Sequence, residues 1–146
     1  MSYTARLSEL LYPLAFHVPL TRDAVNDSAW VSLSNYHRAW LVVNVGAMEQ
    51  GATLDVSIRQ AEDAIGTNAK AITGKAITQL TQVSGDGNGL VCIELQTEEL
   101  DVDGGFEHVQ FRVTCGPNWV TYSAILYGCS ARFKPVATTN WDEIVG

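Results

Sequence analysis

Short segments that alternate apolar and polar residues, separated by turn-forming residues, recur along most of this chain. In the segment 52–60, Leu54, Val56 and Ile58 fall on one side and polar residues fall between them. This period of two is typical of a strand with one buried face. Several such strands separated by turn residues indicate a sandwich or a barrel. We therefore expect an all-β, jelly-roll-like β-sandwich of about seven or eight short strands.

The strand segments differ in how they distribute apolar residues. In His37–Val45, Trp40, Leu41, Val42 and Val43 are apolar on both faces, which predicts a central strand covered on each side. The turn residues Gly116, Pro117 and Asn118 predict a hairpin, Ser84–Gly89 a loop, and Thr97–Leu100 one helical turn. The complete set of expected strands is Ala29–Leu33, His37–Val45, Ala52–Gln60, Lys70–Thr73, Ala76–Thr81, Leu90–Gln96, Phe106–Cys115 and Trp119–Cys129.

The two ends of the chain lack this alternation. Leu7, Leu10 and Leu11 have helical spacing, and Pro13 limits the predicted helix to a short one within residues 4–12. We expect an irregular segment from Pro19 to Asp27 and an extended arm from Ser130 to Gly146. The predicted organisation is one domain, with an N-terminal arm at 1–35, a sandwich core at 36–129 and a C-terminal arm at 130–146.

Charge and hydropathy exclude two classes of partner. With 9 basic and 16 acidic residues the net charge is −7, and the basic residues are scattered, so we expect no binding to nucleic acid. The longest apolar run, Ala39–Val43, is far shorter than the roughly 20 residues needed to cross a bilayer, and no signal-peptide pattern opens the chain. We expect no membrane partner and synthesis in the host cytoplasm.

Residues that carry chemistry are not grouped in any known pattern. His17, His37 and His108 have no partner at metal-ligand spacing, and no nucleophile has a matched base. The acidic turn Asp101–Gly105 resembles a calcium loop only superficially, because the ligand pattern with its terminal Glu is absent. Cys92, Cys115 and Cys129 are expected as reduced thiols, although a Cys115–Cys129 bond between adjacent strands stays open. We expect no enzyme, no cofactor and no metal.

Aromatic residues in the expected arms are the positive signal. The chain has four tryptophans and five tyrosines, and several lie outside the expected core. Such side chains are costly to leave in water and are common anchors at interfaces. One interpretation is that an arm packs on a neighbouring subunit or on a partner lattice; the other is that both arms fold back over their own sandwich. The candidate interface residues are Tyr3, Tyr12, Trp30, Phe133, Val136 and Trp141.

The stretch from Tyr36 to Val113 resembles a group of small proteins encoded among tailed-phage head genes. The similarity is strongest in ATLDVSIRQAEDAIGTNAKAITGKAITQLT (52–81) and VCIELQTEELDVDGGFEHVQFRVT (91–114). The resemblance covers about half of the chain and leaves out the first 35 residues and the tail that holds Trp141. It implies a virion structural protein of the capsid decoration, or cement, type: a jelly-roll-like subunit that forms trimers on the outer capsid surface.

Three functions follow from these observations. The first is a homotrimeric decoration protein that binds the major capsid protein on the outer surface of the virion and stabilises the head. The second is a head–tail connector or tail-tube subunit. The third is a carbohydrate-binding module on the virion surface, in which Trp30, Trp119 or Trp141 would line a shallow groove.

Overall fold

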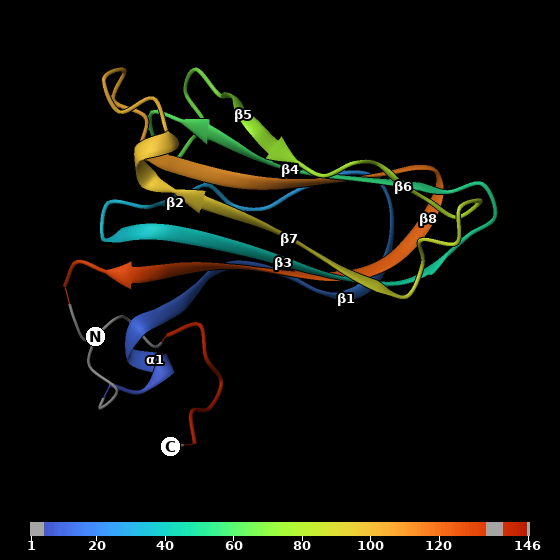
Figure 1. The fold of residues 1–146 in the computed structure, drawn as a ribbon, viewed down its shortest axis with the longest axis horizontal. Coiled ribbons are helices and arrows are strands. Elements are labelled where there is room, and N and C mark those ends of the chain that lie inside the picture. The colour runs from blue at the N-terminus through green and yellow to red at the C-terminus, as the bar shows by residue number, and fades with distance from the viewer. Residues whose placement is uncertain (1–4, 134–138, 146) are drawn as a thin grey trace.

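The computed structural model describes residues 5–133 and 139–145, and most of these residues lie in strands (Figure 1). One α-helical turn, α1, precedes the first strand, and one 3-10 turn, η1, follows the seventh. In chain order the elements are α1 (Leu7–Leu10), β1 (Leu11–Asp27), β2 (Val31–Ser32), β3 (Tyr36–Met48), β4 (Thr53–Ala61), β5 (Lys70–Ala76), β6 (Leu80–Thr81), β7 (Gly89–Gln96), η1 (Thr97–Glu99) and β8 (His108–Ala131).

The strands form one antiparallel sheet that folds over into two layers, because β1 and β8 each run through both (Figure 1). In one layer, the first half of β8 pairs with β4, and β4 pairs with β5 and β6. In the other layer, the second half of β8 pairs with β3, and β3 pairs with β7. Strand β1 pairs with β8 in both layers. The all-β sandwich expected from the sequence is confirmed.

The hydrophobic core lies between the two layers. The alternation in β4 buries Leu54, Val56 and Ile58. The neighbouring strand β8 has the same alternation and contributes the fully buried Phe111 and Val113. Burying a side chain of this size contributes about 1.5–3 kcal/mol each, so this period-two pattern is the main reason that the layers close. No described helix is both long and apolar enough to cross a membrane.

Strand β1 corrects the expectation for the N-terminal region. The helix is shorter than predicted, and the chain from Leu11 to Asp27 pairs with β8 along its length, where an irregular segment from Pro19 was expected. Proline cannot donate a hydrogen bond to a ladder, but β1 has β8 as its strand partner, so Pro13 and Pro19 can leave their nitrogens on the open side. Part of the stretch predicted as an arm therefore belongs to both layers.

Strand β8 corrects the predicted hairpin at Gly116–Asn118. The chain does not reverse there: β8 continues from His108 to Ala131 and bends from one layer into the other, and the Gly116–Pro117 peptide bond is cis. Turn-forming residues permit a bend in a strand as well as a reversal, and the sequence alone does not distinguish the two. The remaining predicted strands are present, within a few residues of the predicted bounds, as β2 to β7.

The bend in β8 also removes the possible cysteine bond. Cys115 pairs with Leu54 in one layer and Cys129 pairs with Arg38 in the other, so the two residues belong to opposite halves of one strand. All three cysteines are free thiols. Burial raises the pKa of Cys115 to about 11, which makes this thiol a poor nucleophile at neutral pH.

Candidate interaction face on the outer side of the second layer

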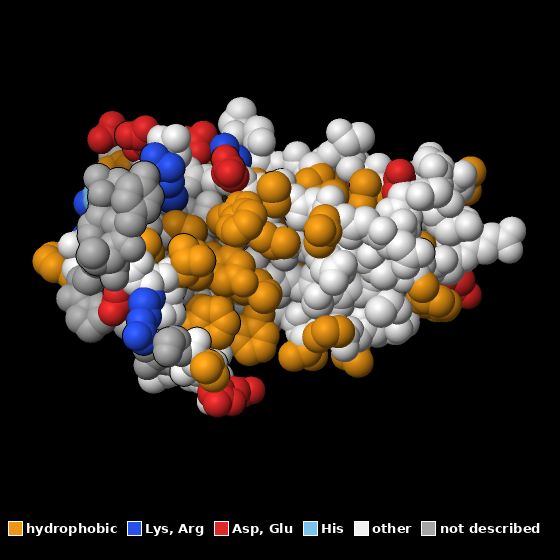
Figure 2. Space-filling model, turned by 60° about the horizontal axis from the view of Figure 1, so that its bottom comes forward, with side chains coloured by type: hydrophobic (Ala, Val, Ile, Leu, Met, Phe, Trp, Pro, Cys, Tyr) orange, Lys and Arg blue, Asp and Glu red, His pale blue; other side chains and the backbone are white. Residues whose placement is uncertain are grey.

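The outer side of the layer formed by β7, β3, β8 and β1 carries large apolar side chains. The register places Trp40 between Glu94 of β7 and Tyr127 of β8. The next row towards the middle of the strands holds Cys92, Val42, Ile125 and Phe16 from the four strands in turn. We call Phe16, Trp40, Val42, Cys92, Ile125 and Tyr127 the apolar face; Figure 2 shows apolar side chains gathered on the side of the molecule that is turned forward.

The outer side of the first layer differs in composition. There the outward residues of β4 and β8, all partly exposed, are Asp55, Ser57, Arg59, Arg112 and Thr114, and β1 adds the exposed Val25 beside Thr114. An antiparallel sheet with one solvated side normally carries polar residues on that side, and the first layer follows this rule. The apolar face on the second layer is therefore an exception to this rule, and the stability of the sandwich core does not require it. Contiguous exposed apolar surface of this kind is typical of interaction sites.

The aromatic side chains of the face support one another but stay partly open. The rings of Trp40 and Tyr127 lie with their centroids 6.0 Å apart and their planes tilted by 31°. Trp40 keeps 40% of its surface exposed, although its strand β3 lies between two others, and Phe16 of β1 keeps 49%. A contact that covered both rings would remove a large apolar area from water, which is the usual source of binding energy at an interface.

The C-terminal tail borders this face near α1. Residues Trp141, Ile144 and Val145 and the helix residue Leu7 meet Trp40 and Tyr127 around a hollow of about 410 Å³. Two hydrogen bonds to the Tyr12 hydroxyl hold the tail: one with Thr139 Oγ1 at 2.8 Å and one from the Asn140 backbone nitrogen at 3.1 Å. The described part of the C-terminal arm thus folds back on its own sandwich.

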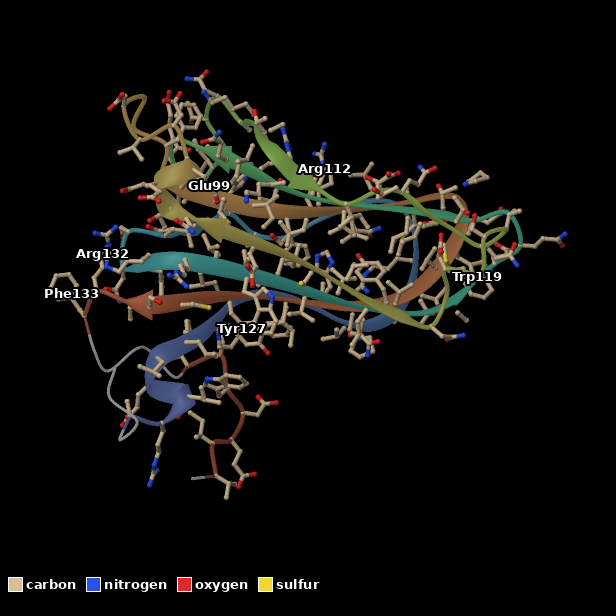
Figure 3. The ribbon with its side chains drawn as sticks, viewed as in Figure 1. Glu99, Arg112, Trp119, Tyr127, Arg132 and Phe133 are labelled. Atoms are coloured by element: carbon tan, nitrogen blue, oxygen red, sulfur yellow. The ribbon has the colours of Figure 1, made fainter. Side chains whose placement is uncertain are left out.

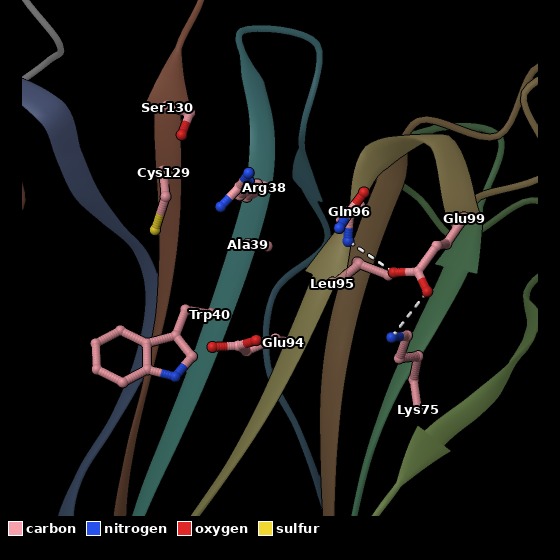
Figure 4. A pocket seen from close by; sticks show the side chains of 10 residues that line it. All are labelled: Arg38, Ala39, Trp40, Lys75, Glu94, Leu95, Gln96, Glu99, Cys129 and Ser130. Carbon is pink, nitrogen blue, oxygen red and sulfur yellow. Dashed lines mark hydrogen bonds and ion pairs between the residues drawn. The ribbon is translucent and has the colours of Figure 1, made fainter. Parts of the chain in front are cut away.

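A second hollow, of about 430 Å³, lies at the opposite border of the face, between β3, β7 and η1 (Figure 4). Lys75 Nζ is 3.0 Å from Glu99 Oε1, and the Glu99 carboxylate also accepts a hydrogen bond of 2.7 Å from the Gln96 backbone nitrogen. These contacts, the backbone one first, lower the pKa of Glu99. Arg38 and Glu94 line the same hollow next to Trp40, so this border carries both signs of charge.

The residues predicted from the sequence as interface anchors do not form one site. Tyr12 is buried against Tyr36, and Trp141 packs on this pair at the edge of the apolar face. Trp30 stacks over Gly66 and near Arg59 in the other layer, and Phe133 is 76% exposed beyond the end of β8. Tyr3 and Val136 lie outside the described residues.

The sequence did contain a signal for the residues that the prediction missed. The segment His37–Val45 is apolar on both faces, which predicts a strand covered on each side. The structure covers its inner side completely, since Leu41 and Val43 are inaccessible to solvent, whereas Trp40 on its outer side is open. Tyr127 and Phe16 could not be added from the sequence alone, because only the register places them beside Trp40 and Val42.

No metal-binding arrangement emerges among the described residues. They contain no group of three or more His, Cys, Asp or Glu that could hold a metal ion. In the acidic turn, Asp101 accepts hydrogen bonds from Lys70 Nζ at 2.6 Å and from the Gly104 backbone nitrogen at 3.0 Å, and these lower its pKa. Its carboxylate is therefore already engaged by the protein.

The tryptophans proposed for a sugar-binding groove lie in three separate places. Trp30 lies beside Gly66, Trp119 follows the bend of β8 near Glu49, and Trp141 lies in the tail. Figure 3 shows Trp119 at the end of the sandwich opposite Phe133. A single groove lined by these three rings is not present.

Comparisons with known proteins find similarity at the level of structure only. No family model and no curated protein sequence matches the chain. Among solved structures, the SPBc2 prophage-derived protein YomS is similar with 11% identity, a TM-score of 0.45, and coverage of 81% of this chain and 93% of that one. A protein of Broad Bean Stain Virus is similar with 12% identity, a TM-score of 0.45 and coverage of 91% and 92%. The xylan-binding module CBM15 has 9% identity, a TM-score of 0.38 and coverage of 84% and 94%.

Proposed function

We propose that this chain is a virion structural protein that decorates the outer capsid surface of a tailed phage as a homotrimer and stabilises the head. The proposal rests on the apolar face: a sandwich whose core is complete carries a second, open set of Trp40, Tyr127 and Phe16 on one outer side. Such a surface serves contact with other protein chains. The resemblance of residues 36–113 to products of phage head genes supports a phage head as the place of that contact.

The physical argument for a decoration role is one of avidity. A capsid lattice offers the same shallow contact at many equivalent positions, and an oligomer can touch several of them at once. Simultaneous weak contacts combine into tight attachment without a deep pocket on either partner. A rigid sandwich with an apolar face and an ordered tail beside it provides contacts of that kind.

The charge of the chain agrees with a place outside the DNA-filled shell. Its net charge is −7, and the lysines and arginines that could bind phosphate are scattered along the sequence. An acidic outer protein stays soluble and avoids contact with released DNA. The same property would be unfavourable for a protein that lines the inside of the head.

The proposal is tested on purified particles. We expect mass spectrometry to find the chain in virions, and the recombinant chain to rebind particles stripped of it and to raise their resistance to heat. Negative-stain images should show it on the outer shell as trimers. Its absence from virions would contradict the proposal, and a larger ring at the head–tail junction would replace it with the connector or tail-tube function.

A further inference from the structure

Strand β3 has the composition of a strand covered on both sides, but the described chain covers one side completely and the other only in part. Leu41, Val43 and Val45 point into the core and have 0–1% of their surface exposed. The residues between them, Trp40 and Val42, point outwards together with Tyr127 and Ile125 of β8. Strands that alternate in burial carry polar residues on the open side, so apolar residues at these outer positions indicate a second cover that is added by another chain.

Two residues of opposite charge flank Trp40 on this face. Glu94 is the neighbour of Trp40 on β7, and Arg38 lies two residues before Trp40 on β3 (Figure 4). Both side chains are exposed. The ion pairs among the described residues are Lys70–Asp101, Lys75–Glu99 and Arg112–Asp27, and they include neither Arg38 nor Glu94.

We infer that a second copy of this chain covers the apolar face, with Arg38 of one copy facing Glu94 of the other beside the two Trp40 rings. This inference goes beyond the proposed function, because a face-to-face contact pairs two copies, whereas a three-fold trimer closes through contacts between unlike surfaces. A face that contacts the same face of another copy must be self-complementary, and a face with one cation and one anion beside a shared apolar centre meets this condition.

The charge of the whole chain also favours contact at this face. Two copies with a net charge of −7 each repel one another over most of their surfaces. On the outer side of the second layer, in the rows of the apolar face and the rows next to them, the charged strand residues are Arg38 and Glu94, so their charges cancel. Glu143 of the tail lines the hollow at one border of the face. Copies can therefore approach here with less like-charge repulsion than at the acidic turns.

The area of the apolar face determines how much further surface the interface must bury. Four strands about 4.8 Å apart and rows about 7 Å apart give the six apolar side chains an extent of roughly 200 Å². A stable interface buries about 800 Å² on each partner, so the face forms the centre of the contact. The small polar residues Asn44, Ser123 and Thr121 on the same side can form the hydrated rim around it.

The open edge of β1 is a less suitable surface for a second copy. Its pairing with β8 is broken by three register shifts, between Pro13 and Ala15, between His17 and Leu20, and between Arg22 and Ala24. Prolines and bulges in an edge strand prevent the addition of another strand. The contact between copies is therefore expected on the side of the sheet and not along this edge.

Two tryptophan variants provide a matched test. Trp40→Glu places a charge in the apolar face, and Trp119→Glu places the same charge at a tryptophan of nearly equal exposure, 40% against 38%, at the far end of the sandwich. Sedimentation velocity over a range of concentrations should give an oligomer for the wild type and for Trp119→Glu. For Trp40→Glu the two-fold association should be lost, so that the particle has half the mass of the wild type, or its dissociation constant should be raised at least about a hundredfold.

A charge exchange tests the pair at exposed positions where folding is not at risk. Arg38→Glu and Glu94→Arg should each raise the dissociation constant at least about tenfold, and the double variant Arg38→Glu/Glu94→Arg should recover most of the loss. Circular dichroism of each variant checks the fold. A wild type that stays monomeric at every concentration, equal effects of the two tryptophan variants, or a double variant as weak as the sum of the single ones would overturn the inference.

The outcome for this surface is separable from the outcome for the proposed function. If the chain oligomerises through the apolar face but is missing from virions, the decoration role fails and the inference stands. If the chain occurs on virions and Trp40→Glu still forms the two-fold pair, the role stands and the self-contact through this face is wrong.

Discussion

At the scale of single residues, Gly128 allows the ring of Tyr36 to pack directly on β8. A Cβ atom at this position would lie 2.8 Å from three ring carbons of the buried Tyr36, closer than real contacts allow. We expect Gly128→Ala to lower the free energy of unfolding by about 1–3 kcal/mol, because the ring has to move out of a packed site. Urea unfolding measures the loss. The control is Gly116→Ala in the same strand, where a Cβ atom would meet nothing within 4 Å and the change should be small.

Asp27 and Arg112 form a bidentate ion pair across β1 and β8, with N–O distances of 2.6 and 2.8 Å. The hydrogen bonds from Arg112 lower the pKa of Asp27. Because the folded-state pKa lies below the unfolded-state value of about 4, the stabilisation is complete above that value and is lost as the pH falls through the folded-state pKa.

Asp27→Asn should therefore reduce the free energy of unfolding at neutral pH, and the difference from the wild type should shrink as the pH falls below about 4. The loss should not exceed about 1 kcal/mol, since water reaches about a third of both side chains and screens the pair. Unfolding curves measured at several pH values check this. A difference that grows in acid would contradict the assignment.

At the scale of elements, the strands with a clean period of two were predictable and the long crossing strands were not. In β4 and β7 the alternation alone locates the strand and its buried side. In β1 and β8, prolines and a glycine indicate breaks, but the chain uses them where a strand bends or lies at an edge. Whether a strand continues past such residues depends on the partner strand, which is distant in the sequence.

The tail is held by the Tyr12 hydroxyl, by a hydrogen bond of 2.8 Å from Asn140 Nδ2 to the Pro13 carbonyl oxygen and by the packing of Trp141. Tyr12 Oη makes hydrogen bonds with Thr139 and Asn140, so Tyr12→Phe should loosen residues 139–145 while the buried ring keeps its place. Hydrogen exchange should become faster in the tail and stay unchanged in β3 and β4. Tyr127→Phe removes a hydroxyl for which the described residues provide no hydrogen bond, and it should leave the exchange of the tail unaltered. Unchanged exchange in Tyr12→Phe would contradict a role of this hydroxyl in holding the tail.

At the scale of the whole molecule, the two outer sides of the sandwich differ, and this difference underlies the proposed role. The polar side needs no partner, whereas the side with Trp40, Tyr127 and Phe16 gains free energy when another surface covers it. Part of this site was visible in the sequence as a strand apolar on both faces. The rest was not, because Tyr127 and Phe16 are distant in the sequence and become neighbours only through the register of β3, β8 and β1.

Hydroxyl-radical footprinting of the assembled chain, as oligomer or on particles, tests the apolar face most directly. The oxidation rates of Trp40 and Tyr127 are compared with those in the dilute, dissociated chain, and Trp119 serves as an internal reference. We predict that assembly lowers the rates at Trp40 and Tyr127 several-fold, to about the level of buried aromatic residues, and leaves Trp119 unchanged. Equal oxidation of Trp40 in the assembled and dissociated chains would contradict the role of this face.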